Sequence, residues 1–357
     1  MMQKRRVPAA PTFVQILLTR ECNLACDYCS AAQFHANEKE PDLTTGEWLK
    51  VLARLKEIQV FRLDISGGEI FLRKDIFDIL EAAEKCKFPK MSIITNGTLI
   101  DEGTAKNLKD LNIRRISISL DGDSGAHDTV RGAGSFNRTM KGIGHLADNG
   151  IIPEILFTPL KSNYTALGAL VDILYPLGIR KLSFNILHPA GRSRNSYKKI
   201  RLDCFADSAA FHKAIETVRE KYRDFGVANL PLVYQSFPHM YADEGDASNP
   251  GGKKCLKPCS AGHSSCNITA GGWVIPCSEL FDFKGGNIKE RDILDIWRNS
   301  ENFEKIRRLS DVSSDQIPYC RNCDYNIFCG AGCRADAYTI FGDLTAPDPF
   351  CPYWKQK

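Results

Sequence analysis

The first two thirds of the chain alternate between short runs rich in β-branched residues and longer runs whose apolar residues recur at helical spacing. The short runs predict strands at 12–19, 61–66, 90–96, 114–121, 152–159 and 181–189. The longer runs predict helices at 44–59, 75–87, 102–111, 137–149, 166–176 and 205–224. Thr44 and Glu47 have the spacing of a capping box, which marks the start of the first helix.

Repeated strand–helix units predict parallel strands joined by right-handed crossovers. Six units are too few for a closed eight-stranded barrel, so the pattern alone allows a partial barrel or an open sheet. Nearly every distinctive polar residue stands at the C-terminal end of a predicted strand, the end that carries the chemistry in barrels. We therefore expect an α/β fold, with an N-terminal tail at 1–12 and a partial six-unit barrel over 13–225.

The pattern changes at about residue 226. The polar, glycine-rich stretch "HMYADEGDASNPGGKK" predicts a linker or bridging loop over 226–258. The remaining residues, 259–357, are dense in cysteine and carry short strands and turns. We expect them to form a second, small α+β domain held together by metal.

Composition sets broad limits on the protein class. The chain has 357 residues, of which 43% are hydrophobic and 25% charged, as expected for a globular protein with a buried core. The basic start "MMQKRRVPAAP" is not followed by an apolar run, and no stretch approaches eighteen apolar residues. We therefore expect neither a signal peptide nor a membrane span, and a cytoplasmic location.

Fourteen cysteines change this picture. A disulfide framework is typical of short secreted chains, whereas clustered cysteines in a reducing compartment more often bind metal. Ligand thiolates are deprotonated, so three bound iron–sulfur cubes would add a net charge of roughly −5 and offset the formal +4. The basic pI is therefore no indication of a nucleic-acid partner.

The stretch "ECNLACDYCS" places Cys22, Cys26 and Cys29 directly after the first predicted strand. Only two of the three could pair as a disulfide, whereas the spacing suits a loop wrapped around one compact cluster. A [4Fe–4S] cube has four irons, so three thiolates leave one iron open to another ligand. Zinc is the competing interpretation.

The cysteine loop resembles the signature of the radical S-adenosylmethionine (SAM) superfamily, with Tyr28 as the aromatic residue before the last cysteine. The resemblance implies that the amino and carboxylate groups of SAM chelate the open iron. One electron from the cluster would then cleave SAM into methionine and a 5′-deoxyadenosyl radical. The cofactor supplies this chemistry, and the barrel holds and shields it.

After the second strand comes "SGGEI", in which Gly67 and Gly68 allow close approach of the backbone to a ligand. The resemblance assigns this stretch to the SAM amino group, with Glu69 as the acceptor. Ile70 departs from the family pattern, which usually has proline after the glutamate. A simple glycine turn is the alternative.

Further polar residues follow the later strands. The resemblance assigns Asn96, Ser119 and Asp121 to SAM binding, although strand caps and turns use the same residue types. Arg131, in "HDTVRG", is expected to pair with the SAM carboxylate as a fork or to lie on the surface. Arg192 and Arg194, in "HPAGRSRN", would face substrate or SAM, or solvent.

The tail resembles the SPASM extension of radical SAM enzymes, which carries two auxiliary [4Fe–4S] clusters. Twelve residues separate Cys259 from Gly272, four separate Gly272 from Cys277, and "CRNCDYNIFCGAGC" follows. The resemblance implies a nearer cluster and a farther one, the nearer on Cys259, Cys277 and Cys333, the farther on Cys320, Cys323, Cys329 and Cys351. For the fourth ligand of the nearer cluster we favour Cys266, with Cys255 or an open iron as alternatives. Zinc also competes here.

SPASM enzymes include sulfatase maturases, peptide-crosslinking enzymes, maturases of quinone cofactors and relatives that act on tetrapyrroles. Sulfatase maturases commonly carry an aspartate base after the cysteine that corresponds to Cys277. Here Ser278 follows, and Glu279 is the candidate catalytic base or an ordinary surface residue.

We expect hydrogen abstraction from a ribosomally made peptide, followed by oxidation to a thioether or carbon–carbon crosslink or a related modification. The auxiliary clusters would accept the second electron. The alternatives are radical modification of a small molecule or tetrapyrrole, less readily sulfatase maturation, and a non-enzymatic zinc scaffold. Only 21 residues precede Cys22, so we expect that a leader-binding partner is a separate chain or that leader recognition is absent. A flavodoxin- or ferredoxin-type protein would donate electrons.

Overall fold

The strands of the first two thirds lie where the sequence predicts them. A computed structural model describes residues 7–113, 115–203, 206–228, 259–309, 312–324, 326–351 and 353. In it, successive strands pair in parallel and in chain order. They are β1 (Phe13–Leu17), β2 (Arg62–Ser66), β3 (Lys90–Thr95), β4 (Ile116–Ser119), β5 (Glu154–Phe157) and β6 (Lys181–Phe184). Each lies within its predicted range.

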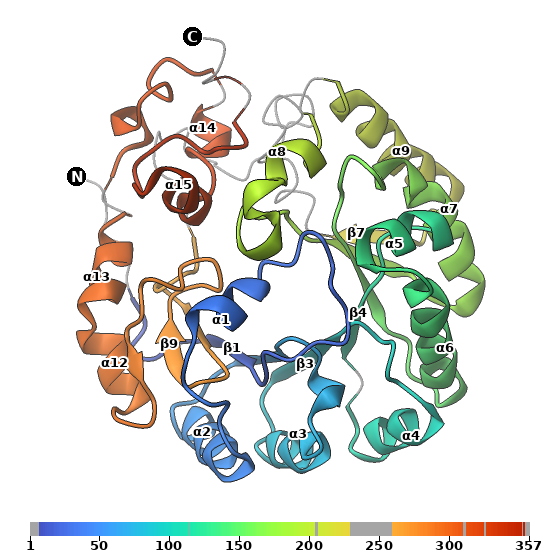
Figure 1. Ribbon diagram of the computed structural model, residues 1–357, viewed down its shortest axis with the longest axis horizontal. Coiled ribbons are helices and arrows are strands. Elements are labelled where there is room, and N and C mark those ends of the chain that lie inside the picture. Colours follow the sequence, from blue (N-terminus) through green and yellow to red (C-terminus); the bar gives the residue numbers. More distant parts are fainter. Residues whose placement is uncertain are drawn as a thin grey trace.

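The predicted helices cover the outer face of this sheet (Figure 1). The Thr44 hydroxyl accepts from the Glu47 backbone N–H, and the Glu47 carboxylate accepts from that of Thr44, which confirms the capping box. The helices are α2 (Thr45–Glu57), α3 (Ile76–Lys85), α4 (Glu102–Asp110), α6 (Ser135–Asp148), α7 (Leu167–Leu174) and α9 (Ser208–Lys221). Shorter helices that the sequence did not predict are α1 (Ala32–Asn37), α5 (Ser124–Arg131) and α8 (Tyr197–Ile200).

The sheet continues at both edges beyond the predicted barrel. At one edge β7 (Gly226–Ala228) pairs in parallel with β6. At the other edge β8 (Ser265–Ile268) pairs in parallel with β1, and β9 (Trp273–Ile275) and β10 (Gly286–Asn287) follow as antiparallel strands. The described strands therefore have the order β10-β9-β8-β1-β2-β3-β4-β5-β6-β7. Of the predicted linker, only 226–228 is described, and the sheet runs on across both proposed domain boundaries.

The first half of the tail shares the barrel's apolar core. Cys266 and Phe303, fully buried, belong to the same cluster as Val14 of β1. Trp297 also packs there and donates from its indole nitrogen to the Pro8 carbonyl, 3.0 Å away. The tail helices are α12 (Ile293–Asn299), α13 (Glu301–Arg308), α14 (Asn326–Cys329) and α15 (Arg334–Phe341).

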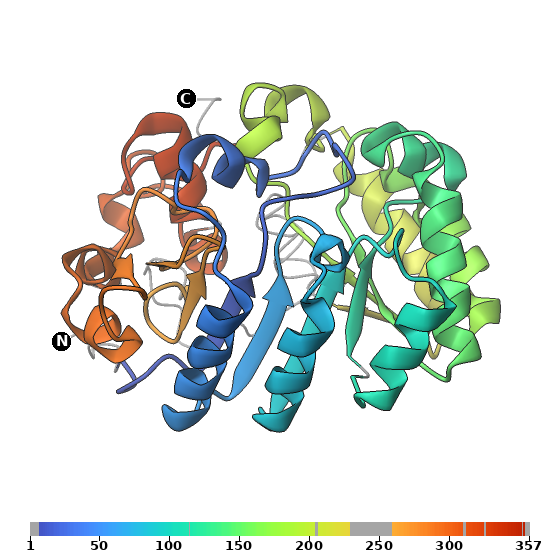
Figure 2. The same ribbon diagram turned by 60° about the horizontal axis from the view of Figure 1, so that its bottom comes forward.

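The C-terminal ends of the parallel strands point to one side of the molecule, where α1 and α8 lie (Figure 2). Loops from several strands meet there because parallel strands release their chains at the same edge. Among the described residues, none of the helices combines the length and apolar character that crossing a bilayer requires.

Candidate active site

The cysteine loop lies directly after β1, with Cys26 buried, Cys29 partly buried and Cys22 exposed. Burial raises the pKa of all three thiols, and each also interacts with the charge of another of the three. Each of these three neighbouring thiols opposes the ionisation of another. A cationic metal centre would stabilise all three as thiolates. The loop therefore fits an iron–sulfur cluster held by three protein ligands.

A buried ion pair contacts this loop at Cys26 and Tyr28. Arg131 Nε lies 2.6 Å from Asp121 Oδ2, and Tyr28 donates its hydroxyl to the same carboxylate oxygen at 2.7 Å. A second guanidinium nitrogen donates to the Tyr28 hydroxyl, and the third lies 3.8 Å from Cys26 Sγ. All three nitrogens of Arg131 thus contact the chain itself. The assignments of Arg131 and Asp121 to SAM remain predictions.

Glu69 is fully buried and its carboxylate accepts three hydrogen bonds from the chain. The donors are the Thr95 hydroxyl at 2.7 Å, the Asn96 backbone N–H at 2.8 Å and the Phe71 backbone N–H at 3.2 Å. Burial raises the pKa of this carboxyl, and the hydrogen bonds oppose the rise. Glu69 therefore joins the end of β2 to the end of β3, and its contact with the SAM amino group remains a prediction.

The two glycines before Glu69 pack against the start of the cysteine loop. A Cβ at Gly68 would lie 2.0 Å from the Glu21 carbonyl oxygen, and one at Gly67 would lie 2.6 Å from the Thr19 carbonyl oxygen. Their closeness allows two backbone hydrogen bonds of 2.7 Å, from Gly68 to Thr19 and from Glu69 to Glu21. Contact between the two loops therefore requires glycine here, whether or not a ligand also approaches.

The remaining predicted SAM residues follow β3 and end β4. Asn96 is buried, donates to Asn23 Oδ1 at 2.8 Å and lies 4.0 Å from Cys22 Sγ. Ser119 is the last residue of β4 and is partly buried. Asn96 thus contacts the cysteine loop near Cys22, whereas Arg131 contacts it near Cys26.

Two adjoining hollows open beside the cysteine loop. One, of about 480 Å³, is lined by Cys22, Cys29 and the glycine pair. The other is a more open groove of about 1130 Å³, and Arg192 and Arg194 line it together with Cys22. The loop after β6 brings these arginines here, because the Arg192 backbone N–H donates to the Cys29 carbonyl at 3.1 Å.

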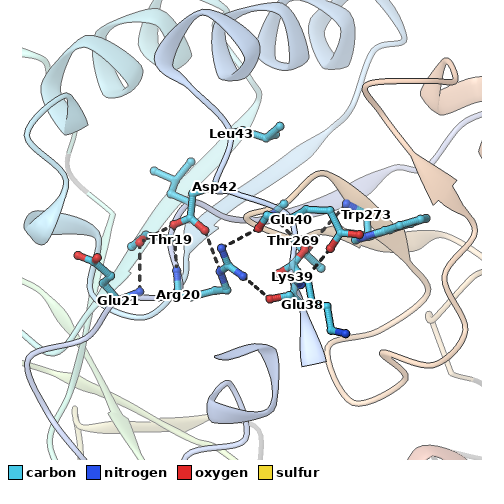
Figure 3. Close-up of polar contacts among 12 residues, drawn as sticks. Thr19, Arg20, Glu21, Glu38, Lys39, Glu40, Asp42, Leu43, Thr269 and Trp273 are labelled. Atoms are coloured by element: carbon cyan, nitrogen blue, oxygen red, sulfur yellow. Dashed lines mark hydrogen bonds and ion pairs between the residues drawn. The ribbon is translucent and has the colours of Figure 1, made fainter. Parts of the chain in front are cut away.

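A polar network after α1 fastens the cysteine loop to the tail (Figure 3). Arg20 donates to Asp42 Oδ1 at 2.8 Å and to the carbonyl oxygens of Glu38 and Glu40. The buried Glu38 carboxylate accepts from the Thr269 hydroxyl and from the Gly271 backbone N–H in the β8–β9 turn. Sequence reasoning missed this network, since its members are not spaced as any motif.

Three of the four cysteines expected around the nearer auxiliary cluster come together. Burial, and the charges of Glu279, Cys259 and Cys333, raise the pKa of the Cys277 thiol. Cys266 instead points into the apolar core from β8, and the charge that it interacts with is that of Arg307. The structure does not bring Cys266 to the group, because its position in β8 directs the side chain into the core shared with the barrel. The alternative, Cys255, lies outside the described residues.

The cysteines expected around the farther cluster also gather. The Cys320 thiol interacts with the charges of Cys323 and Cys351, and burial together with these charges raises its pKa to about 12. The buried Cys329 thiol interacts with Cys320 and Cys351. A group of neighbouring thiols fits a metal centre, because a bound metal stabilises the thiolate forms. Asp348 lies between the two groups, accepting from the Cys333 backbone N–H at 2.7 Å.

Glu279, the candidate base, is buried beside the nearer group with 6% of its surface exposed. Its Oε1 accepts from the Ser278 hydroxyl at 3.3 Å, and its Oε2 is buried. Burial raises the pKa of this carboxyl, and the nearby His188 opposes the rise. His188 and Asp336, which sequence reasoning did not single out, lie with Cys333 within 4.8 Å of one another.

Three thiols thus follow the first strand of a partial barrel, and a second thiol-rich unit is joined to the same sheet. Residues 16–168 match the radical SAM superfamily, and residues 259–324 match the SPASM iron–sulfur cluster-binding domain. The chain therefore carries a radical SAM domain followed by a SPASM domain, as its sequence predicts.

Similar proteins span most of the chain. The AdoMet-dependent heme synthase of Nitratidesulfovibrio vulgaris is 29% identical, covering 94% of this chain and 90% of its own. The PqqA peptide cyclase of Rhizobium meliloti is 26% identical, with 94% and 85% covered. Among solved structures, Streptococcus suis SuiB bound to precursor peptide SuiA has a TM-score of 0.76 at 22% identity, covering 97% of this chain and 77% of SuiB. Native anSMEcpe with bound AdoMet has a TM-score of 0.71 at 19% identity, with 97% and 95% covered. These structures share the fold, which confirms a partial barrel followed by a SPASM domain.

Proposed function

We propose that this protein is a SAM-dependent oxidoreductase with three [4Fe–4S] clusters, which abstracts a hydrogen atom from a peptide and completes its oxidation to a crosslink or related modification. The observation that carries the proposal is the position of the three-cysteine loop at an open groove, with two further thiol groups behind it in the same chain. Bound SAM and its cluster would supply the radical. The chain's own residues hold the loop, line the groove and place a buried carboxylate near the nearer thiol group.

The position of Glu279 near the groove supports the oxidative modification of a bound substrate. Gln33 lines the groove and donates to the Ser278 carbonyl at 2.9 Å, so the segment that carries Glu279 borders it. A buried carboxylate with a raised pKa suits proton removal during an oxidative bond formation. The relatives include the PqqA peptide cyclase, and SuiB, which shares the fold, is bound to a precursor peptide in its solved structure. We further propose an external flavodoxin- or ferredoxin-type electron donor and a separate leader-binding protein.

A second candidate substrate is a tetrapyrrole that carries carboxylate groups. Arg192 and Arg194 are both exposed on the wall of the groove, where two guanidinium groups could bind two carboxylates. Heme synthases stand among the relatives of this chain. The two proposals differ in the substrate that binds in the groove, a peptide or a tetrapyrrole, and share the same radical chemistry.

SAM cleavage tests the enzyme proposal. Anaerobically purified protein should contain about twelve irons with matching sulfide per chain, following four irons per cluster, and should form 5′-deoxyadenosine from SAM and dithionite. Cys26→Ala should abolish this product and lower the iron content by about four per chain. Cys86→Ala is the matched control, since Cys86 caps α3 and contacts the Leu52 carbonyl far from the loop. Zinc without sulfide would support the scaffold alternative.

Mass spectrometry separates the two substrates. We expect a small peptide encoded beside the gene to lose the mass of a pair of hydrogen atoms when incubated with SAM and reductant. An altered porphyrin, with peptides unchanged, would favour the second candidate. In that case the double variant Arg192→Gln and Arg194→Gln should raise the KM for the porphyrin, while uncoupled 5′-deoxyadenosine formation persists.

A further inference from the structure

One loop connects the two thiol sites of the barrel and the tail. It follows β6 and begins at His188, whose ring reaches α15 in the tail. A few residues later, the Arg192 backbone N–H contacts the Cys29 carbonyl of the cysteine loop. A Cβ at Gly191 would lie 2.3 Å from that same carbonyl oxygen, so the loop is packed tightly against it.

The His188 ring lies beside a carboxylate and a thiol. Its Nδ1 is 2.8 Å from Asp336 Oδ1, and Asp336 is 2% exposed in the first turn of α15. Cys333 is the N-cap of the same helix, and its sulfur lies within 4.8 Å of both the ring and the Asp336 carboxylate. The ring itself is three-quarters buried.

The Asp336 carboxylate fixes the orientation of the His188 ring. A carboxylate accepts hydrogen bonds, so Asp336 orients the ring by accepting from Nδ1–H, as carboxylates do for histidines beside metal sites. Cys333 lies close to both the ring and this carboxylate, so its sulfur is available to a ring N–H. Thiolate sulfur in a cluster also accepts, so it would share a ring N–H hydrogen.

We propose that His188 is a positioning residue which, oriented by Asp336, donates a hydrogen bond to the Cys333 sulfur and raises the reduction potential of the nearer auxiliary cluster. This rests on the proposed function only in taking Cys333 as a cluster ligand. Hydrogen bonds to cluster sulfurs are among the factors that set cluster potentials, because they stabilise the more negative, reduced state. The nearer cluster would thereby become the better electron acceptor of the auxiliary pair.

The test is a potentiometric titration of the anaerobically reconstituted full chain, followed by electron paramagnetic resonance. His188→Phe removes both ring donors while keeping a ring of similar size, and His188→Gln retains an N–H. We expect the midpoint of one auxiliary signal to become more negative in His188→Phe and to be intermediate in His188→Gln. The other signals should stay in place as internal references. His145→Gln, a partly exposed position on α6, is the matched control.

Two results would overturn the inference. One is an unchanged midpoint for every signal in His188→Phe with full iron content. The other is loss of about four irons per chain in both His188 variants, which would make His188 a cluster ligand instead of a hydrogen-bond donor. Iron analysis and 5′-deoxyadenosine formation by the unmodified protein distinguish these results from failure of the proposed function, since both would then remain intact.

Discussion

Arg131 and Asp121 form an ion pair, 2.6 Å between Nε and Oδ2, in which both side chains are buried beneath the cysteine loop. The pair joins α5 to the residue that follows the buried Leu120 at the end of β4. Asp121 Oδ1 also accepts from the Thr158 backbone N–H at 2.8 Å, after β5. One carboxylate therefore connects three separate segments, and it contacts the cysteine loop through the Tyr28 hydroxyl.

We expect Arg131→Gln to lower the free energy of unfolding by about 3–5 kcal/mol, because it leaves Asp121 buried without its charge partner. Denaturant unfolding followed by circular dichroism measures this loss. Arg308→Gln is the control, since Arg308 pairs with Glu304 on an exposed helix face and should change stability by less than about 1 kcal/mol. Equal effects of the two substitutions would show that the buried pair is not a support of the loop.

Gly68→Ala should destabilise the protein by about 1–3 kcal/mol, as overpacking does, and should reduce cluster incorporation. The added methyl would meet the Glu21 backbone, which cannot move without displacing the cysteine loop. Gly144→Ala is the matched control: it lies within α6 with open space around its Cβ position, so we expect a gain of about 0.5–1 kcal/mol. Thermal melts and iron content measure the two effects, and a neutral Gly68→Ala would contradict the packing argument.

Cys266→Ala tests which cysteines hold the nearer auxiliary cluster. Because Cys266 lies in the apolar core, we expect the variant to retain the iron content of the unmodified protein while losing about 1 kcal/mol of stability. Cys277→Ala should lose iron, since Cys277 lies beside Cys259 and Cys333. Iron and sulfide analysis of the three proteins gives the result. Loss of a cluster from Cys266→Ala would restore Cys266 as a ligand.

Because His127 is buried, we expect the protein to lose stability in mild acid. It is fully buried, accepts from the Asp121 backbone N–H at 3.1 Å, and burial, aided by the Arg131 charge, lowers its pKa to about 4. The unfolded chain therefore binds a proton that the folded chain excludes, so stability is full above about pH 6.5 and falls as the pH drops toward about 4. The difference amounts to about 3 kcal/mol across this window.

Thermal melts of the unmodified protein and of His127→Gln at pH 7 and pH 5 measure this dependence. We expect the melting temperature of the variant to fall less between the two pH values, because glutamine does not titrate. Comparison at matched pH removes the contribution of acid-labile clusters, which affects both proteins. Parallel falls in the two proteins would assign the acid sensitivity to other groups.

Much of the fold followed from local pattern. The β-branched runs and the helical spacing between them were sufficient to locate β1 to β6 and their covering helices, and Thr44 and Glu47 marked the start of α2. Short elements such as α5 escaped detection because a few residues carry too little periodicity. The parallel pairing of β8 with β1 was also beyond reach, since it joins residues about 250 positions apart.

The sequence by itself determined the three-cysteine loop, the thiol-rich tail and the family, because ligand spacing within a short segment is a local property. Only the tertiary structure decided which polar residues turn toward their own chain. It placed Arg131 on Asp121 and Cys26, gave Glu69 three hydrogen bonds, directed Cys266 into the core and set His188 beside Cys333. These contacts depend on how distant strand ends converge in space, which residue spacing does not encode.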